Sequence, residues 1–235
     1  MREHLTSPLT LGDLADAVGY SPFHLARLFR TTVGIPPGEF RTALRFHHAK
    51  RLLIGEGLSV TDTCFAVGFD SLGSFSSRFT SLVGVTPATF KRLPELVEGS
   101  TPTRPYVRGA DRAFDGVVRG TVRTTRCSAI YVGLFPQAIA KSRPVAGAFL
   151  TTPGPFELLG VPPGTYRLLA AGQPPGADMI ERLAPDAGTL VGAAPAPVVV
   201  RAGAEVVHQD VWLRPRYATE PPVLVALAAL SMPQL

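Results

Sequence analysis

LTLGDLADAVGYSPFHLARLFRTTVGIPPGEF, residues 9–40, and LSVTDTCFAVGFDSLGSFSSRFTSLVGVTPATF, residues 58–90, follow one pattern twice in a chain of 235 residues. One residue is inserted at Asp70, at the turn of the second copy, so the offset between matching residues grows by one there. The matching pairs are Asp13 and Asp62, Ala17 and Ala66, Gly19 and Gly68, Ser21 and Ser71, Phe29 and Phe79, Gly34 and Gly84, Pro37 and Pro87, and Phe40 and Phe90. An internal repeat of this kind predicts two copies of one supersecondary unit.

Each copy carries local helix signals. The segments Thr10–Asp13 and Ser59–Asp62 are capping boxes, whose side chains satisfy free N–H groups at a helix start. Ser21–Pro22 is an N-cap followed by proline at the first helical position, and Ser71 is the equivalent cap in the second copy. Gly19 ends the first helix. Each copy therefore predicts two short helices joined by a tight turn, which is typical of a helix-turn-helix unit.

The apolar spacing predicts which side chains form the core. The inward residues on the second helix of each copy are expected to be Leu25, Leu28 and Phe29, then Phe75, Phe79 and Leu82. Between the copies, Glu39–Leu53 continues a helical pattern that would hold the two units at a fixed separation. Thr86–Pro87 starts one more helix after the second copy.

Three segments together resemble a known family. They are HLARLFRTTVGIPP, LRFHHAKRLL and SFSSRFTSLVGVTPATF, in this order. Residues 5–93 resemble the DNA-binding domain of the AraC/XylS family of transcription regulators. The resemblance implies two helix-turn-helix units whose second helices enter successive major grooves of double-stranded DNA, about one helical turn apart.

The resemblance also implies which side chains face DNA. The first reading helix would present Phe23, Ala26, Arg27 and Arg30, and the second Leu72, Gly73, Ser76, Ser77 and Arg78. Arg27 is the expected base contact, because a bidentate arginine matches the O6 and N7 edge of guanine. Many relatives carry a long polar or basic residue where this chain has Ser77, so the second unit is expected to grip phosphate more than it reads bases. A solvated surface charge is the alternative for Arg78.

The start of the chain departs from the family. Relatives have a further helix packed on the first unit, whereas here only Arg2–Leu5 precede Thr6–Pro8. Either the chain starts later than its relatives or Met1 is internal to a longer reading frame. Without that helix, part of the first unit's core should be exposed, at a cost of about 1.5–3 kcal/mol for each uncovered Leu or Phe.

The chain changes character after residue 97. Residues 98–113 predict a linker from their Gly, Ser, Thr and Pro content, and residues 114–235 then show the two-residue period of strands. Strands are expected near 118–123, 130–135, 146–151, 155–159, 165–171, 197–201 and 205–213. The predicted fold is an all-α double helix-turn-helix domain over residues 1–97, followed by an all-β sandwich of about seven strands. Such a linker predicts that the two halves unfold independently.

A second resemblance lies in the β half. GPFELLGVPPGTYRLLA, at Gly154–Ala170, resembles a hairpin of prealbumin-like domains, such as the regulatory domains beside carboxypeptidases. Val161–Gly164 would form the tight turn, with Gly164 supplying a positive φ. Those domains are usually structural or binding modules, so the resemblance implies no reaction.

Patterns that carry chemistry are scarce. The sequence has no Gly-rich phosphate loop, no HExxH and no GxSxG. Cys64 and Cys127 form no metal-ligand spacing, and neither has the local signature of the reactive cysteine in the family's fusions to alkylation-repair enzymes. His47–His48 face about 100° apart on a helix, and His208 with Asp210 lacks a third ligand. We therefore expect no enzyme activity, no cofactor and no metal.

The chain is basic, with a formal charge of +5, which suits an anionic partner. Six arginines lie in one stretch: Arg104, Arg108, Arg112, Arg119, Arg123 and Arg126. They are either the solvated face of a linker and a strand or additional phosphate contacts. No apolar run is long enough to span a membrane, and the first residues lack the apolar core of a signal peptide. A cytoplasmic location is expected.

These observations predict a sequence-specific DNA-binding transcription regulator. Two alternatives stay open: a carbohydrate- or peptide-binding β-module that carries a DNA reader, and an undetected enzyme activity in the β half. Further partners left open are a second copy of the chain, a small-molecule effector and RNA polymerase. The apolar segment Pro222–Leu230 must be buried as an edge strand, against the reader or in a partner, since an exposed one favours aggregation.

Overall fold

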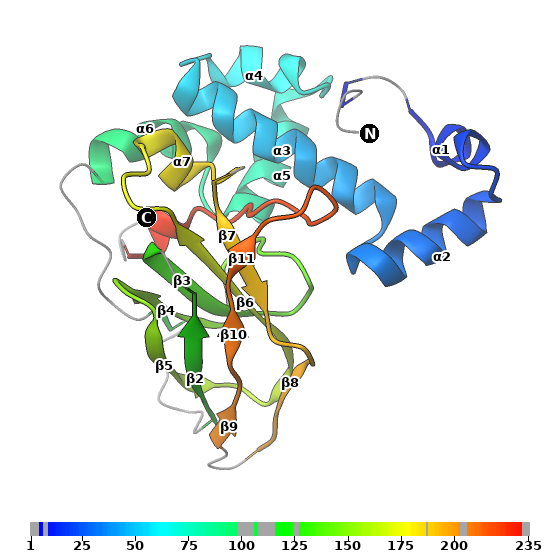
Figure 1. Ribbon diagram of the computed structural model, residues 1–235. Helices are drawn as coiled ribbons and strands as arrows, with labels where there is room; N and C mark the ends of the chain where they lie inside the picture. The colour runs from blue at the N-terminus through cyan, green and yellow to red at the C-terminus, as the bar shows by residue number, and fades with distance from the viewer. Residues whose placement is uncertain are drawn as a thin grey trace.

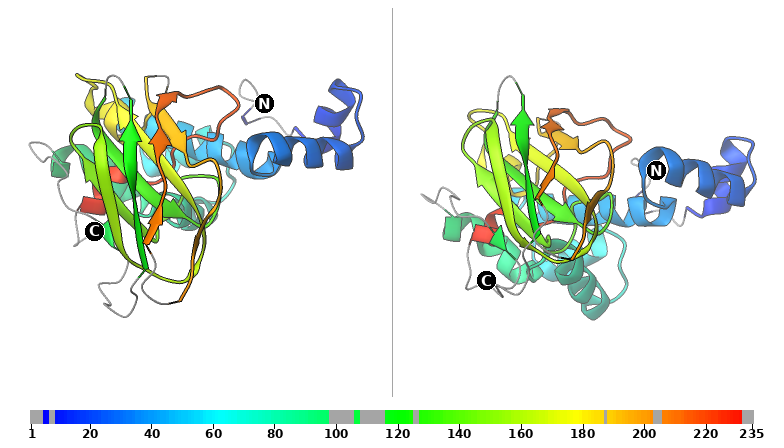
Figure 2. Two further views of the ribbon diagram at one scale, coloured as in Figure 1. Left: turned by 60° about the horizontal axis from the view of Figure 1, so that its bottom comes forward. Right: turned by 90° about the horizontal axis from the view of Figure 1, so that it is seen from below.

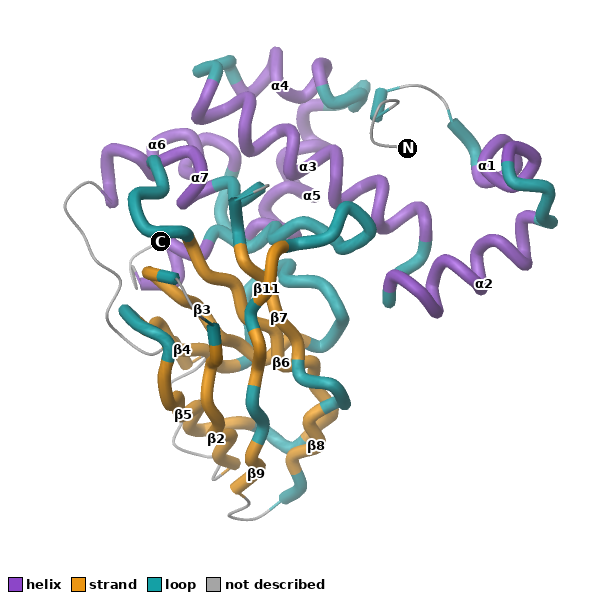
Figure 3. Tube along the Cα trace, in the orientation of Figure 1, coloured by secondary structure: helices purple, strands orange, loops and turns teal. Residues whose placement is uncertain are grey.

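The computed structural model describes residues 5–6, 9–97, 106–107, 116–124, 127–186, 188–202 and 206–231. Helices form the N-terminal half and two β-sheets the C-terminal half, and the halves lie against each other (Figure 1). The trace coloured by secondary structure makes the same division visible (Figure 3). The expected fold class is thereby confirmed. None of the described helices is long and apolar enough to cross a membrane.

The helical half follows the repeat. Its helices are α1 (Leu11–Ala17), α2 (Pro22–Val33), α3 (Pro37–Gly55), α4 (Val60–Ala66), α5 (Leu72–Val83) and α6 (Pro87–Val97). The capping box is complete at α1, where the N–H of Asp13 donates to Thr10 Oγ1 and the N–H of Thr10 donates to the Asp13 carboxylate. Gly34 and Gly84 end α2 and α5 in the left-handed conformation that favours glycine. At α4 only half of the expected capping box forms: the N–H of Asp62 donates to Ser59 Oγ, and the Asp62 carboxylate accepts from the Ser59 hydroxyl and not from the Ser59 N–H. The serine caps of α2 and α5 and their glycine ends are the same in both units.

The β half contains more strands than the expected seven. The described strands are β1 (Tyr106–Val107), β2 (Gly116–Arg123), β3 (Ser128–Phe135), β4 (Ala146–Leu150), β5 (Gly154–Val161), β6 (Gly164–Gln173), β7 (Leu190–Ala193), β8 (Val198–Val200), β9 (Val206–His208), β10 (Val211–Trp212) and β11 (Arg214–Pro215). The large sheet has the order β1-β4-β3-β6-β7-β11 with β8 on β6, and the small sheet has the order β10-β2-β5 with β9 on β2. Several additional strands have only two residues, too few to show a period of two.

Two short helices accompany the sheets. They are α7 (Met179–Leu183) and the 3-10 helix η1 (Leu227–Ser231). Asp178 caps α7 by accepting from the N–H of Glu181. The sequence pattern indicated neither helix, because each has only five residues and shows no helical period.

The turn at Val161–Gly164 differs from the expectation. Strand β5 belongs to the small sheet and β6 to the large sheet, so the turn joins two sheets and is not a hairpin. Its positive φ belongs to Gly160, at 66°, and not to Gly164. Gly164 is needed for space, because a Cβ there would lie 2.6 Å from the hydroxyl oxygen of Tyr166, which donates to the Pro162 carbonyl.

The large sheet is buried on both faces. One face packs on the small sheet through a core that includes Val132 and Leu158. The opposite face carries Tyr131 and Phe135, which pack with the C-terminal segment through residues such as Val225. Strand β3 is consequently buried along most of its length, as expected of a strand covered on both sides.

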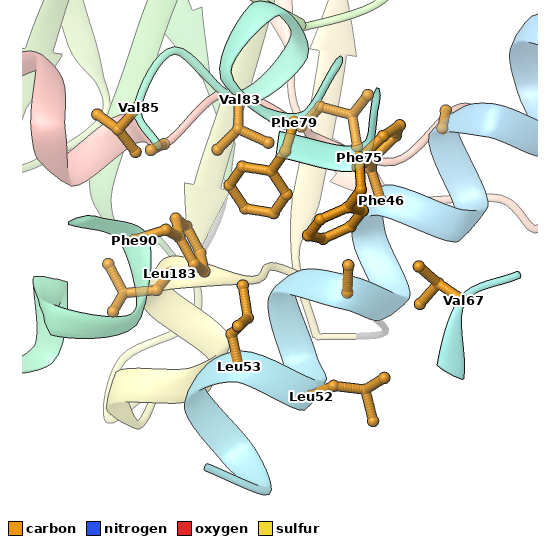
Figure 4. Packing of buried hydrophobic residues seen from close by; sticks show 14 of the residues in the cluster. Phe46, Leu52, Leu53, Val67, Phe75, Phe79, Val83, Val85, Phe90 and Leu183 are labelled. Atoms are coloured by element: carbon orange, nitrogen blue, oxygen red, sulfur yellow. The ribbon is translucent and has the colours of Figure 1, made fainter. Parts of the chain in front are cut away.

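One hydrophobic core connects the two halves. Phenylalanines of α3, α5 and α6 meet there (Figure 4). The same core includes Leu183 of α7, Leu224 and Ala226, so it continues into the β half. Because the halves share this core, their packing gives no support to the prediction that they unfold independently. Most of the linker, residues 98–105 and 108–113, lies outside the described residues, and Tyr106–Val107 pairs with β4 as a short strand.

The C-terminal segment is buried against the helices. Leu224, Val225 and Ala226 are almost fully buried. The N–H groups of Leu224 and Val225 donate to the Ala140 carbonyl, and the N–H of Ala226 donates to the Val83 carbonyl of α5. The sequence left three burial sites open for Pro222–Leu230: an edge strand, the helical half or a partner. The structure shows this segment packed against the helical half.

Candidate nucleic-acid interface

Helix α2 presents the first set of expected reading residues on its surface. Phe23 is 80% exposed, Arg27 and Arg30 are exposed, and Ala26 is partly exposed. The unit projects from the body of the molecule at one end of α3 (Figure 2). Nothing in the described residues covers this face, so its four side chains are available to a duplex.

Helix α5 presents the second set. Leu72, Gly73, Ser77 and Arg78 are exposed, and Ser76 is partly exposed. Ser76 and Ser77 also border a shallow hollow, shared with the start of α6 at Pro87. Apart from the exposed Leu72, the residues here are small or polar, and Arg78 carries the positive charge. The structure thus places all nine expected residues at accessible or partly accessible positions on the two second helices.

The inward face of α2 is not the buried stripe that the spacing predicted. Leu28 is 43% exposed, Leu25 and Phe29 are half-buried, and α2 has no fully buried residue. The physical reason is a shortage of neighbours, since α2 packs mainly on the two-turn helix α1. Val18 and Tyr20 are further exposed apolar residues of this unit.

The charges on the reading helices are unpaired. Within the described part of the chain, Arg27, Arg30 and Arg78 make no side-chain hydrogen bond or ion pair. In the β half, by contrast, Arg119 pairs with Glu157, and Arg123 pairs with Asp210 at 3.1 Å. For these two residues the structure favours the solvated strand face over phosphate contact. Arg104, Arg108, Arg112 and Arg126 of the same stretch lie outside the described residues.

Helix α3 fixes the frame of the site through two arginines. Arg41 Nη1 donates to the Leu9 carbonyl at 2.6 Å, and Arg45 Nε donates to the Leu5 carbonyl at 2.6 Å. These bonds tie the segment before α1 to the helix that separates the two units. In the second unit, Lys91 Nζ donates to the carbonyls of Gly57 and Leu58 and so holds the α3–α4 turn.

A buried lysine marks the contact between α3 and the C-terminal segment. Lys50 has no exposed surface, and its Nζ donates to the carbonyls of Val223 and Leu224 at 3.2 Å each. The ammonium also lies 5.4 Å from the centre of the Phe90 ring. Burial lowers the pKa of Lys50 to about 7. The sequence pattern missed this residue because a lysine among apolar positions reads as a surface charge.

A polar cluster lies beside it. His47 is buried, with Nε2 3.6 Å from Asp186 Oδ1, and burial lowers the His47 pKa. Asp186 also accepts from Arg216 Nη2 at 2.8 Å and faces Arg51 at 3.9 Å. The imidazole of His47 first, with the guanidinium groups of Arg216 and Arg51, holds the pKa of Asp186 at about 2. This cluster connects α3 to the loop after α7 and is structural.

The loop between β3 and β4, residues 136–145, touches both units. The N–H of Ser142 donates to the Leu82 carbonyl at 2.6 Å, at the end of α5. Lys141 pairs with Glu39 in the first turn of α3. Ala138 lies beside Gly34, the residue that ends α2, because a Cβ on that glycine would be 3.1 Å from Ala138 Cβ. We call residues 136–145 the bridging loop.

Known proteins match the helical half. A family model described as a helix-turn-helix domain matches residues 14–93, the region of both units just described. Residues 14–93 are an AraC-type helix-turn-helix domain.

Curated relatives share this domain. The HTH-type transcriptional activator AarP of Providencia stuartii is 38% identical over 88 residues, which are 37% of this chain and 65% of AarP. Right origin-binding protein of Escherichia coli is 33% identical over 127 residues, 49% of this chain and 44% of that protein. The bifunctional transcriptional activator/DNA repair enzyme Ada of Escherichia coli is 36% identical over 85 residues, 36% of this chain and 24% of Ada. The chain thus spans less than two thirds of each of these relatives.

Among solved structures, a transcriptional regulator with an AraC-type DNA-binding domain from Chromobacterium violaceum is 32% identical. The match covers 39% of this chain and 81% of that chain, with a TM-score of 0.37.

The two cysteines lie in settings that disfavour a thiolate. Cys64 is buried, which raises the pKa of its thiol. Burial also raises the pKa of Cys127 to about 11, and its Sγ donates to the Gln173 carbonyl. A reactive cysteine needs the opposite shift. Among the described residues, no group of three or more His, Cys, Asp or Glu side chains could hold a metal ion.

Proposed function

We propose that this chain is a sequence-specific DNA-binding transcription regulator. The observation that carries the proposal is the repeated helix-turn-helix unit whose second helices, α2 and α5, expose arginines that no carboxylate of the described residues neutralises. The named functions of the relatives, transcriptional activation among them, support it. Unpaired cations on a protruding helix lose less on binding phosphate than paired ones, because no ion pair must be broken first.

The proposed roles follow the geometry of each helix. Arg27 reads a guanine from α2, with Phe23, Ala26 and Arg30 beside it on the same exposed face. On α5, short side chains at Gly73, Ser76 and Ser77 allow close approach, while Leu72 and Arg78 contact the groove edge and a phosphate. Residues 1–97 are the reader, 98–113 the linker and 114–235 a module that tunes the reader.

We further propose that the β half carries no reaction. The support is the chemistry of its side chains: Cys127 is held as a thiol, and the arginines Arg119 and Arg123 serve ion pairs. A carbohydrate- or peptide-binding module finds no specific observation in its favour.

The test is binding to a duplex selected from random sequence, followed by fluorescence anisotropy over a salt series. Arg27→Ala should cost roughly 1–3 kcal/mol on the selected site and relax base preference at one position. Arg167→Ala, on β6, removes one positive charge from the far half and serves as the matched control. Equal selectivity in the Arg27 variant and the wild type would show that Arg27 does not read a base. Failure to select any sequence would contradict the proposed function itself.

A further inference from the structure

A cavity of about 620 Å³ lies between the helical half and the outer face of the large sheet. Its inner wall is apolar, with Tyr131 and Phe135 from β3. Ile139 of the bridging loop and Val223 of the C-terminal segment also line it. Thr32 and Val33, in the last turn of α2, complete the wall. The volume falls in the range of small-molecule sites, about 300–1,000 Å³, which are mostly apolar with a few polar groups at the edge.

The rim of this cavity is electrically neutral. Arg214 is the cation there, and both of its Nη atoms donate to the carboxylate of Glu220, at 2.6 and 2.9 Å. Its guanidinium also stacks on Tyr217, 4.3 Å from the ring centre. Because Arg214 and Glu220 neutralise each other, a charged ligand would find no unpaired counter-ion at the rim. Thr32 and Thr219 add hydroxyl groups there. The lining therefore suits an uncharged molecule with an apolar body and a hydrogen-bonding edge.

The cavity wall is also part of the frame that holds the reading helices. Residues 138–140 of the bridging loop line the cavity, and the same loop bonds the end of α5 through Ser142. Ala138 lies against the residue that ends α2. A molecule that fills the cavity therefore contacts α2 directly and α5 through the loop. If this molecule binds more tightly when α2 is in one position than in another, its binding shifts α2 toward that position. The affinity of the chain for DNA then changes as well.

We propose that this cavity is a binding site for an uncharged, largely apolar small molecule, aromatic or alicyclic, whose occupancy alters the setting of α2. The part about DNA affinity rests on the proposed function, whereas the binding site itself does not. Trp212 is the single tryptophan of the chain, lines the cavity and is 68% exposed. It therefore reports on the cavity without a label.

The probe is N-phenyl-1-naphthylamine, an uncharged aromatic dye whose absorption overlaps tryptophan emission. We expect saturable energy transfer from Trp212 to the dye in the full chain. Val191→Phe, which fills the cavity from β7, should weaken dye binding at least tenfold. Val199→Phe makes the same change on β8, outside the cavity, and should leave it unchanged. Thermal melting of both variants checks that each is folded.

Several results are decisive. Dye binding that is absent in the wild type, or equal in the Val191→Phe and Val199→Phe variants, overturns the site. If the link to α2 holds, the dye should change the DNA affinity measured by anisotropy about fivefold or more, in either direction. A change of less than about twofold while the dye occupies the cavity overturns that link. A chain that binds dye at the cavity but selects no DNA sequence contradicts the proposed function and leaves the site standing.

Discussion

The two helix-turn-helix units share one sequence pattern and differ in how deeply they are buried. Helix α5 buries Phe75, Phe79 and Val83 completely, whereas α2 buries none of its twelve residues completely. Their caps are the same: a serine at the start and a left-handed glycine at the end. Local signals therefore determine that each helix forms, and the neighbours determine how much apolar surface it loses.

The difference in burial follows from the elements that pack on each unit. The second unit is enclosed by α3, α6, the bridging loop and the C-terminal segment, which bonds α5 through Val83. In the first unit, α2 packs on α1 and the start of α3, and the bridging loop reaches only the end of α2 (Figure 1). Because its packing is lighter, the first unit is expected to open at a lower free energy than the second, as lightly packed elements do. We infer that the second unit anchors the reader while the first adjusts to the duplex.

Among the substitutions that test this difference between the units, Phe79→Ala should lower the unfolding free energy most. Phe79 is fully buried among Phe46, Phe75 and Phe90, so truncation should cost about 3–5 kcal/mol of unfolding free energy. Because this core continues into the β half, Trp212 fluorescence and far-ultraviolet dichroism should shift together in denaturant. If the dichroism midpoint shifts to lower denaturant while the Trp212 fluorescence midpoint is unchanged, the two halves unfold independently, as the linker predicted.

Lys50, on α3 beside the second unit, should make the stability of the chain depend on pH. The Lys50 pKa is lowered from 10.5 to about 7 in the folded chain. Between these values the unfolded chain holds a proton that the folded chain releases, so stability rises with pH through this window. A gain of about 3–4 kcal/mol from pH 7 to pH 10 is expected in denaturant titrations.

Lys50→Met is the control for that slope, because it retains the length of the side chain and removes the titrating group. Other groups that titrate in the same range remain in both proteins and cancel in the difference. If the variant shows the same slope as the wild type, the buried lysine is not its source.

The sequence could predict the parts of this site that depend on local chemistry. Caps at Thr10, Ser21 and Ser71, and the outward faces of α2 and α5, follow from residue type and spacing. It could not predict that Lys50 is buried, because the covering carbonyls come from residues 223 and 224, far along the chain. The cavity was equally hidden, since its walls come from segments that meet only in the folded molecule.

Phe29→Ala tests the comparison at the position equivalent to Phe79. Phe29 is half-buried and packs edge-on against Phe40, with ring centres 5.4 Å apart. Its truncation should therefore cost about 1.5–2.5 kcal/mol, roughly half the cost at Phe79, since the loss scales with the apolar area removed from water. Hydrogen exchange should rise mainly in α1 and α2. Equal losses from the Phe29 and Phe79 variants would mean that the two units are buried alike.

Leu28→Ala should have the smallest effect and the most local one. The sequence spacing placed Leu28 in a core stripe, where truncation would cost about 2–5 kcal/mol. Because 43% of its surface is already exposed in the structure, truncation removes less buried apolar area than it would at a core leucine, and alanine favours the helix slightly. We expect a loss below about 1 kcal/mol in denaturant unfolding, with both probes of the transition unchanged in shape. A loss of 2 kcal/mol or more would show that a further segment covers this face in solution, and the contrast between the two units would then disappear.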